Sequence, residues 1–329
     1  MIKVMITDTI HAASHSVDTI QALLIMCLWP FKTAHLSDDS SQFYCSIATQ
    51  MGLQLGLHRP NQPYWPLRHG SLNVKPSRGA VLHTGHTNLL AAFDSPAIDP
   101  VLSQLCRIYY LLMQLLWEIS ANAPTPTGLV EPSARLVLVR EYREQWTRLE
   151  EQYLTQANDV VKISLLYSRL QLYSFALLDD VPVSEDRLDL VREAEATACE
   201  LIELTYGMNL SIASIHTRRA MCYAAFVLVR LLQLPYYVQR ELLHDSVEHV
   251  RQSLSTAISA PDDINRKAYM ILQDLPYFED KPRSPPILSR MGDSIFYDAL
   301  RVYWEHCLDR QLPQEYLDFD GFDWGALGL

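Results

Sequence analysis

The strongest constraint on the first part of this sequence is a set of apolar residues at helical spacing. These residues lie on two segments joined by a short polar connector. Over 17–28 the apolar residues recur every three or four positions, which is the pattern of an amphipathic helix. Ser16 or Asp18 is the expected N-cap, and Pro30 is expected to end the helix. A second pattern of this kind covers 39–57. Because the connector is short, we expect the two helices to form an antiparallel packed pair.

Helical periodicity resumes near residue 100, and no segment shows the sustained alternation of a β-strand. The sequence therefore predicts an all-α fold, a multi-helix bundle built from antiparallel helical hairpins. Asn158 and Ser184 are the expected N-caps of two helices. Gly207 is the expected C-cap of the second, and Asn209 or Ser211 is expected to open the next helix. The predicted helices cover 99–120, 132–153, 160–178, 184–206, 212–234, 237–259, 264–275 and 288–307.

Composition divides the chain into four parts. The segment 61–98 is rich in Pro, Gly, Asn and His and has no sustained period, which is unusual inside a compact domain. We interpret it as an irregular insertion or an error in the gene model. It separates a helical hairpin at 1–60 from a helical domain at 99–310. An acidic and aromatic tail follows at 311–329.

The 329-residue chain has the composition of a globular protein with a large core, since 49% of its residues are apolar and 20% are charged. Its formal net charge is −11 at pH 7. Phosphate groups repel an acidic chain, so direct binding of nucleic acid by this chain alone is disfavoured. The longest apolar run, 22–31, is too short to cross a bilayer, and we therefore expect no membrane partner.

No motif with catalytic spacing is present in the sequence. It contains no HExxH or GxSxG motif, no phosphate-binding glycine loop and no dinucleotide fingerprint, so we predict no enzymatic activity and no cofactor. Its six cysteines lack the close spacing of a metal cluster, and we expect buried free thiols. His83 and His86 have a spacing that metal sites use on helices, but we expect them to lie in a solvated loop.

Aromatic residues recur on the helices predicted at 160–178 and 212–234. A helical bundle lined by such residues could enclose a small apolar effector. Packing of the hydrophobic core explains the same pattern, and both interpretations stay open. The residues concerned are Tyr167, Tyr173, Phe175, Tyr223 and Phe226.

Acidic and aromatic residues alternate near the C-terminus. The arrangement is typical of activation segments that fold on binding a coactivator, because the acidic groups keep the aromatic rings hydrated. A tail that docks its aromatic rings on its own domain explains the pattern equally well. The residues of this candidate activation segment are Asp318, Phe319, Asp320, Phe322, Asp323 and Trp324.

The N-terminal hairpin carries a recognisable set of residues, in which a Trp-Pro turn ends the first helix and Leu-Gly-Leu-His-Arg ends the second. The residues are Gln21, Trp29, Pro30, Leu55, Gly56, Leu57, His58 and Arg59. This set resembles the opening of the middle homology region of fungal zinc-binuclear-cluster transcription regulators. The segments 289–304 and 318–324 resemble later parts of that region, whereas 61–98 departs from the family's pattern. His58 and Arg59 would cap the end of the helix or meet an anionic effector.

The resemblance implies a nuclear transcription regulator whose helical domain masks or exposes an activation segment. Its partners would be other transcription regulators or coactivators, and its target genes would be those of nutrient use or secondary metabolism. A small-molecule effector is also compatible with the resemblance. Zinc would be held only by an N-terminal module that these residues do not include, so contact with DNA would be indirect. Two alternatives stay open: a helical interaction scaffold or inactive truncated homologue, and an all-α enzyme with an unrecognised site.

Overall fold

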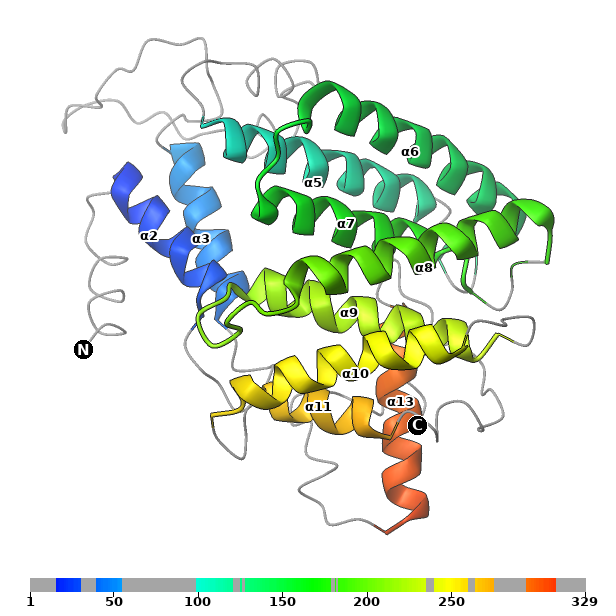
Figure 1. The fold of residues 1–329 in the computed structure, drawn as a ribbon. Coiled ribbons are helices and arrows are strands. Elements are labelled where there is room, and N and C mark those ends of the chain that lie inside the picture. The colour runs from blue at the N-terminus through cyan, green and yellow to red at the C-terminus, as the bar shows by residue number, and fades with distance from the viewer. Residues whose placement is uncertain are drawn as a thin grey trace, which may run out of the picture. The chain divides into compact units, whose positions relative to one another are not determined.

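The computed structural model shows an all-α protein (Figure 1). It describes residues 16–30, 40–54, 99–120, 125, 128–178, 181, 183–234, 240–259, 264–274 and 294–311. Within these segments there are ten α-helices and no β-strand, which confirms the predicted fold class. None of these helices combines the length and the apolar character needed to span a bilayer.

Residue contacts divide the chain into two compact units, and the first contains α2 (Val17–Leu28) and α3 (Ser41–Gln54). α2 has the predicted bounds, because the Ser16 hydroxyl accepts a hydrogen bond from the backbone N–H of Thr19 and caps its first turn. The start of α3 is two residues later than the beginning of the predicted 39–57 helix, and the residues after Gln54 lie outside the described part. A small apolar cluster joins the helices, formed by Ile20, Leu23, Tyr44, Ala48 and Met51.

The second unit is a bundle in which successive helices pack on one another, and the last helix returns against α9 and α11 (Figure 1). α9 lies at its centre, in contact with α7, α8, α10 and α13. Nearly every residue in the second half of α9 is buried, as expected for a helix covered on all sides. The helices are α5 (Pro100–Ile119), α6 (Pro132–Tyr153), α7 (Asp159–Ser174), α8 (Glu185–Thr205), α9 (Ile215–Leu232), α10 (Arg240–Ala257), α11 (Ile264–Gln273) and α13 (Ser294–Asp309).

Local side-chain caps fix several helix ends in the second unit. The side chains of Asn158 and Ser184 accept hydrogen bonds from the first turns of α7 and α8, as predicted. Gly207 has a φ of 79°, the left-handed conformation that glycine adopts most easily, directly after the C-cap Tyr206. Asp99 caps α5 by accepting from the N–H groups of Val101 and Leu102.

Two predicted helix boundaries were wrong, the start of α9 and the end of α7. α9 begins at Ile215 with Ser214 as its N-cap, because Asn209 instead accepts a hydrogen bond from the Ser211 N–H and closes a separate turn. α7 ends at Ser174, four residues before the predicted end at Leu178. The residues after Ser174 form turns whose carbonyl groups bind two buried arginines, as described below. The remaining helix ends differ from prediction by a few residues or adjoin segments outside the described part.

Candidate functional site

Of the predicted residues of the family motif and of the C-terminal tail, the structure describes only Gln21, Trp29 and Pro30. Gln21 is exposed on α2, Trp29 is the C-cap of that helix with 48% of its surface exposed, and Pro30 follows it half-buried. The remaining predicted residues lie outside the described part of the chain, and their roles stay predictions. They are Leu55, Gly56, Leu57, His58, Arg59, Asp318, Phe319, Asp320, Phe322, Asp323 and Trp324.

The aromatic residues that were candidates for an internal effector site belong to the hydrophobic core. Tyr173, Phe175, Tyr223 and Phe226 are each at most 4% exposed and form part of one cluster of buried residues. Tyr167 is half-buried, and its ring meets that of Tyr223 edge-on with the centroids 5.5 Å apart. Core packing therefore accounts for these residues without an effector.

A cavity of about 400 Å³ lies elsewhere, between α11, α13 and the residue after the end of α10. Its volume falls within the range of small-molecule sites, and it is partly open to solvent. Four of its lining residues recur at three- and four-residue steps along α11 and therefore share one face of that helix, and Asp274 directly follows the helix. The lining residues of this α11–α13 cavity are Ile258, Arg266, Tyr269, Met270, Gln273, Asp274, Tyr303 and Arg310.

Contacts from α10 hold one wall of the cavity in place. The Tyr269 hydroxyl accepts a hydrogen bond of 3.0 Å from Arg251 Nη1, and the guanidinium carbon lies 5.3 Å from the centroid of the tyrosine ring. Glu248 fixes Arg251 in turn through two hydrogen bonds of 2.6 Å, and this pairing lowers the pKa of the Glu248 carboxyl. Tyr269 is therefore oriented by a neighbouring helix and not only by α11.

One lining residue of the cavity, Asp274, has its carboxylate beside a buried imidazole. Asp274 Oδ2 lies 3.5 Å from His306 Nε2, and His306 is only 1% exposed. The next residue of α13, Cys307, is fully buried, and burial raises the pKa of its thiol. A buried thiol with a raised pKa is a poor nucleophile.

Metal ligands do not cluster in the part of the chain that the structure describes. No three His, Cys, Asp or Glu side chains come together there in an arrangement that could hold a metal ion. The six cysteines are free and lie on six different helices. Burial raises the pKa of several of these thiols, to about 12 at Cys222.

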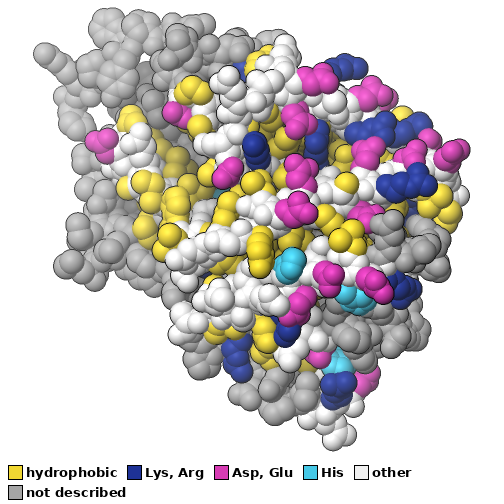
Figure 2. Space-filling model, in the orientation of Figure 1, with side chains coloured by type: hydrophobic (Ala, Val, Ile, Leu, Met, Phe, Trp, Pro, Cys, Tyr) yellow, Lys and Arg dark blue, Asp and Glu magenta, His cyan; other side chains and the backbone are white. Residues whose placement is uncertain are grey.

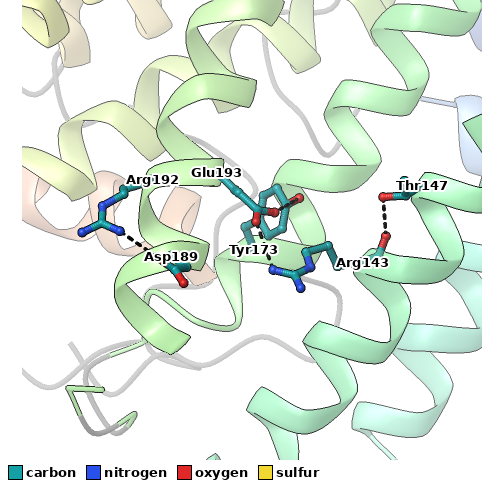
Figure 3. A network of polar contacts seen from close by, with 6 residues as sticks. All are labelled: Arg143, Thr147, Tyr173, Asp189, Arg192 and Glu193. Atoms are coloured by element: carbon teal, nitrogen blue, oxygen red, sulfur yellow. Dashed lines mark hydrogen bonds and ion pairs between the residues drawn. The ribbon is translucent and has the colours of Figure 1, made fainter. Parts of the chain in front are cut away.

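A network of polar contacts joins three helices on another side of the second unit (Figure 3). Glu193 on α8 accepts hydrogen bonds from Arg143 on α6 at 3.0 Å and from the Tyr173 hydroxyl on α7 at 2.9 Å. Asp189 and Arg192 form a separate ion pair on the same helix, at 2.7 Å. Burial, followed by the neighbouring Glu193 carboxylate, raises the pKa of Tyr173.

Replacing Tyr173 by Phe should make the protein less sensitive to alkaline pH. A raised phenol pKa means that the native state favours the protonated tyrosine, whose contribution is complete below the unfolded pKa of about 10 and is lost as pH rises toward the native pKa. Between pH 8 and pH 10.5 we expect the wild type to lose about 1 kcal/mol more unfolding free energy than Tyr173→Phe. Urea denaturation at both pH values measures the difference.

The exposed Tyr206 provides the control, since its ring is 57% exposed and Tyr206→Phe should leave the pH dependence of the wild type unchanged. Equal losses of stability in the wild type and in Tyr173→Phe would contradict the assignment of Tyr173 as an alkaline-sensitive group.

Two buried arginines bind the turns that follow α7. Arg187, at 4% exposure on the first turn of α8, donates to the carbonyl groups of Ala176, Leu178 and Val181. Arg230 on α9 donates through Nε and Nη2 to the carbonyl of Leu177, at 3.3 and 3.1 Å. We call this group the carbonyl junction. Sequence reasoning missed it, although Arg187 stands three and four residues before the buried Leu190 and Val191 on the apolar face of α8.

Acidic and basic side chains alternate over the visible face of α6, α7 and α8 (Figure 2). The pairs that cross between these helices are Arg140–Asp186, Arg143–Glu193 and Arg169–Glu150, with distances of 2.7 to 3.0 Å. Each of these three arginines therefore stands beside a carboxylate. This face does not present the continuous basic surface that binds a nucleic-acid backbone.

Comparison with known proteins places the chain near fungal transcription regulators. It is 26% identical to the putative transcription factor SEF1 of Eremothecium gossypii over 90% of this chain and 32% of that protein. It is 24% identical to the transcriptional regulatory protein SEF1 of Candida albicans over 87% of this chain and 36% of that protein. It is also 24% identical to the putative transcription factor SEF1 of Saccharomyces cerevisiae, over 90% of this chain and 32% of that protein. No family model and no solved structure matches the chain.

These similarities confirm the predicted resemblance to fungal transcription regulators at a general level and support a role in regulating transcription. The names of the relatives describe regulators and not enzymes. The chain spans about a third of the length of these relatives. The assignment to a middle homology region and the absence of a zinc cluster stay predictions.

Proposed function

We propose that this chain is the helical regulatory region of a fungal transcription regulator and acts in the nucleus. The single observation that carries the proposal is its similarity to three proteins named as SEF1 transcription factors or regulatory proteins, which extends over nine-tenths of this chain but only a third of theirs. Similarity over nearly the whole of an all-α bundle, and not over an isolated motif, supports a shared regulatory body.

In this proposal the chain reaches DNA through other transcription regulators or coactivators. The paired charges on α6 to α8 and the net charge of −11 support indirect contact, because neither favours a phosphate backbone. The described cysteines do not fit a zinc cluster, since they stand on separate helices, and we assign no zinc to them. We further propose genes of nutrient use or secondary metabolism as targets.

The acidic and aromatic tail is the proposed activation segment, and a reporter assay tests it. Residues 310–329, tethered to a neutral DNA-binding domain, should activate a reporter gene. Changing Phe319, Phe322 and Trp324 together to Ala should abolish the activation, because the hydrated rings would make the contact with the coactivator. Reporter output, corrected for protein level by immunoblot, measures the effect.

The matched control changes Gln311 and Gln314 to Ala in the same tethered segment, which removes polar groups but no aromatic ring and should leave activation intact. An inactive wild-type tail would remove this part of the proposal and favour a helical interaction scaffold. Activation that survives the loss of all three rings would show that the aromatic residues do not make the contact.

A further inference from the structure

We infer that two copies of this chain associate through the outer face of α5, with the two α5 helices antiparallel across a twofold axis. The face consists of Leu102, Cys106, Met113 and Trp117, and we call it the α5 stripe. The inference concerns an interaction surface and goes beyond the proposed role in transcription. It rests on the exposure of the stripe, on the position of the charged residues of α5 and on the symmetry of the stripe.

The α5 stripe is apolar and exposed from the first turn of the helix to the last. Leu102, Met113 and Trp117 are 53%, 52% and 77% exposed, and Cys106 is half-buried. The four residues follow one another at steps of four, seven and four positions and therefore share one face of the helix. Helices that are apolar on all sides are normally covered on all sides, and exposed apolar patches mark interaction surfaces.

Contacts on the other sides of α5 fix the orientation of the stripe. α5 packs on α6 and α7 (Figure 1). The guanidinium carbon of Arg107 lies 4.0 Å from the centroid of the Tyr153 ring at the end of α6, and the Tyr109 hydroxyl lies 3.3 Å from Ser164 Oγ on α7. Because the helix is held on both sides, the stripe need not be ordered by a partner, which reduces the entropy lost on association.

The chemistry of the stripe favours a second apolar surface as its partner. Every residue of α5 is described, and the helix contains only two charged residues, Arg107 and Glu118. Arg107 is 7% exposed and lies against Tyr153, and Glu118 interacts with Tyr142, so both charges are directed toward α6. A partner that binds through charge finds no pairing group on the stripe, whereas two apolar stripes bury each other without burying an unpaired charge.

The order of the residues along the stripe suits a second copy of the same helix. Leu102 and Trp117 lie equally far from the middle of the stripe, as do Cys106 and Met113. An antiparallel pair with its twofold axis at that middle therefore places Trp117 against the partner's Leu102 and Met113 against the partner's Cys106. In each pair a large side chain meets a smaller one, an arrangement that fills space without a clash.

The size of the stripe sets the expected strength of association. A helix of this length extends about 30 Å and is about 10 Å wide, so one helix pair buries less than the roughly 800 Å² per partner of a standard interface. We therefore expect a weak, concentration-dependent dimer, with a Kd of about 10–100 µM.

Sedimentation velocity of the purified full chain, from about 1 to 200 µM, measures the association. Met113→Glu should raise the Kd at least about tenfold, because it places a carboxylate inside an apolar interface. Leu242→Glu on α10 is the matched control, since Leu242 is 53% exposed, carries the same change of charge and should leave the Kd unchanged. Circular dichroism of both variants shows that they are folded.

Met113→Cys tests the antiparallel arrangement. Oxidation with copper phenanthroline in air should link the introduced thiol to the partner's Cys106 and give a covalent dimer on a non-reducing gel. Adding Cys106→Ser to this variant should abolish the link, because the opposing thiol is lost. A link that persists would show that the two introduced thiols face each other, and would overturn the antiparallel arrangement. Leu242→Cys measures the background from random collision.

Two results would overturn the inference as a whole. A chain that stays monomeric over the full range of concentration would show that no second copy binds the stripe. A dimer that Met113→Glu leaves unchanged, or that Leu242→Glu weakens equally, would place the interface elsewhere. Neither result depends on reporter activation, so failure of this inference and failure of the proposed function are separate outcomes.

Discussion

Arg187→Met is expected to lower the free energy of unfolding by about 4 kcal/mol. The substitution keeps an apolar stem of similar length but leaves the carbonyl groups of Ala176, Leu178 and Val181 without their buried donor. Each buried acceptor that loses its partner costs about 1–3 kcal/mol. These carbonyls follow the C-terminus of α7, where the helix dipole also favours a cation. Urea denaturation followed by circular dichroism measures the loss.

The same substitution at Arg192 is the control, because that side chain lies on the same helix, is 71% exposed and pairs only on the surface with Asp189. Arg192→Met should change stability by less than about 0.5 kcal/mol. Adding Arg230→Met to Arg187→Met should cost less than the sum of the single effects, since both arginines hold the same turns. A stable Arg187→Met protein would show that the turns rearrange or that water replaces the guanidinium group.

The carbonyl junction also explains where sequence-based prediction of the fold succeeded and where it failed. Helix starts at Val17, Asp159 and Glu185 were predictable, because the preceding Ser or Asn caps act within one turn. The end of α7 was not, because apolar residues continue to Leu178, whereas the carbonyl groups after Ser174 bind Arg187 and Arg230 from other helices. Local pattern identifies an apolar face but not the donor that a distant helix supplies.

Prediction of the start of α9 failed for a local reason instead. Asn209 and Ser211 are good capping residues, but they form a turn of their own before Ser214 begins the helix. Several possible caps within six residues leave the choice to packing, which the sequence pattern does not contain.

The candidate binding site could be predicted only in part. The spacing of Arg266, Tyr269 and Gln273 places them on one face of a helix, which the periodicity alone indicates. Nothing in the sequence pairs that face with Tyr303 of α13 or with Arg310, which directly follows α13. A site formed between two helices depends on how they pack. The sequence alone therefore does not distinguish its arginines from ordinary surface charges.

Trp146→Ala is the second substitution with a large expected effect, a loss of about 3–5 kcal/mol of unfolding free energy. Trp146 on α6 has no exposed surface, is among the largest fully buried side chains, and lies with its ring centroid 6.1 Å from that of Tyr142. Alanine would leave a cavity that the rigid helices around it cannot close. Thermal and urea denaturation measure the loss, and the effect should exceed that of any single surface substitution on α6.

Two further variants distinguish the effect of the lost ring volume from other causes of destabilisation. The indole N–H of Trp146 has no hydrogen-bond partner among the described residues, so Trp146→Phe removes no polar contact there and should cost only about 1–2 kcal/mol. Trp117→Ala on α5 removes an indole that is 77% exposed and should cost less than about 0.5 kcal/mol. If Trp146→Phe destabilised the protein as much as Trp146→Ala, the indole N–H and not the ring volume would be the stabilising group, and the packing of α6 would need a different explanation.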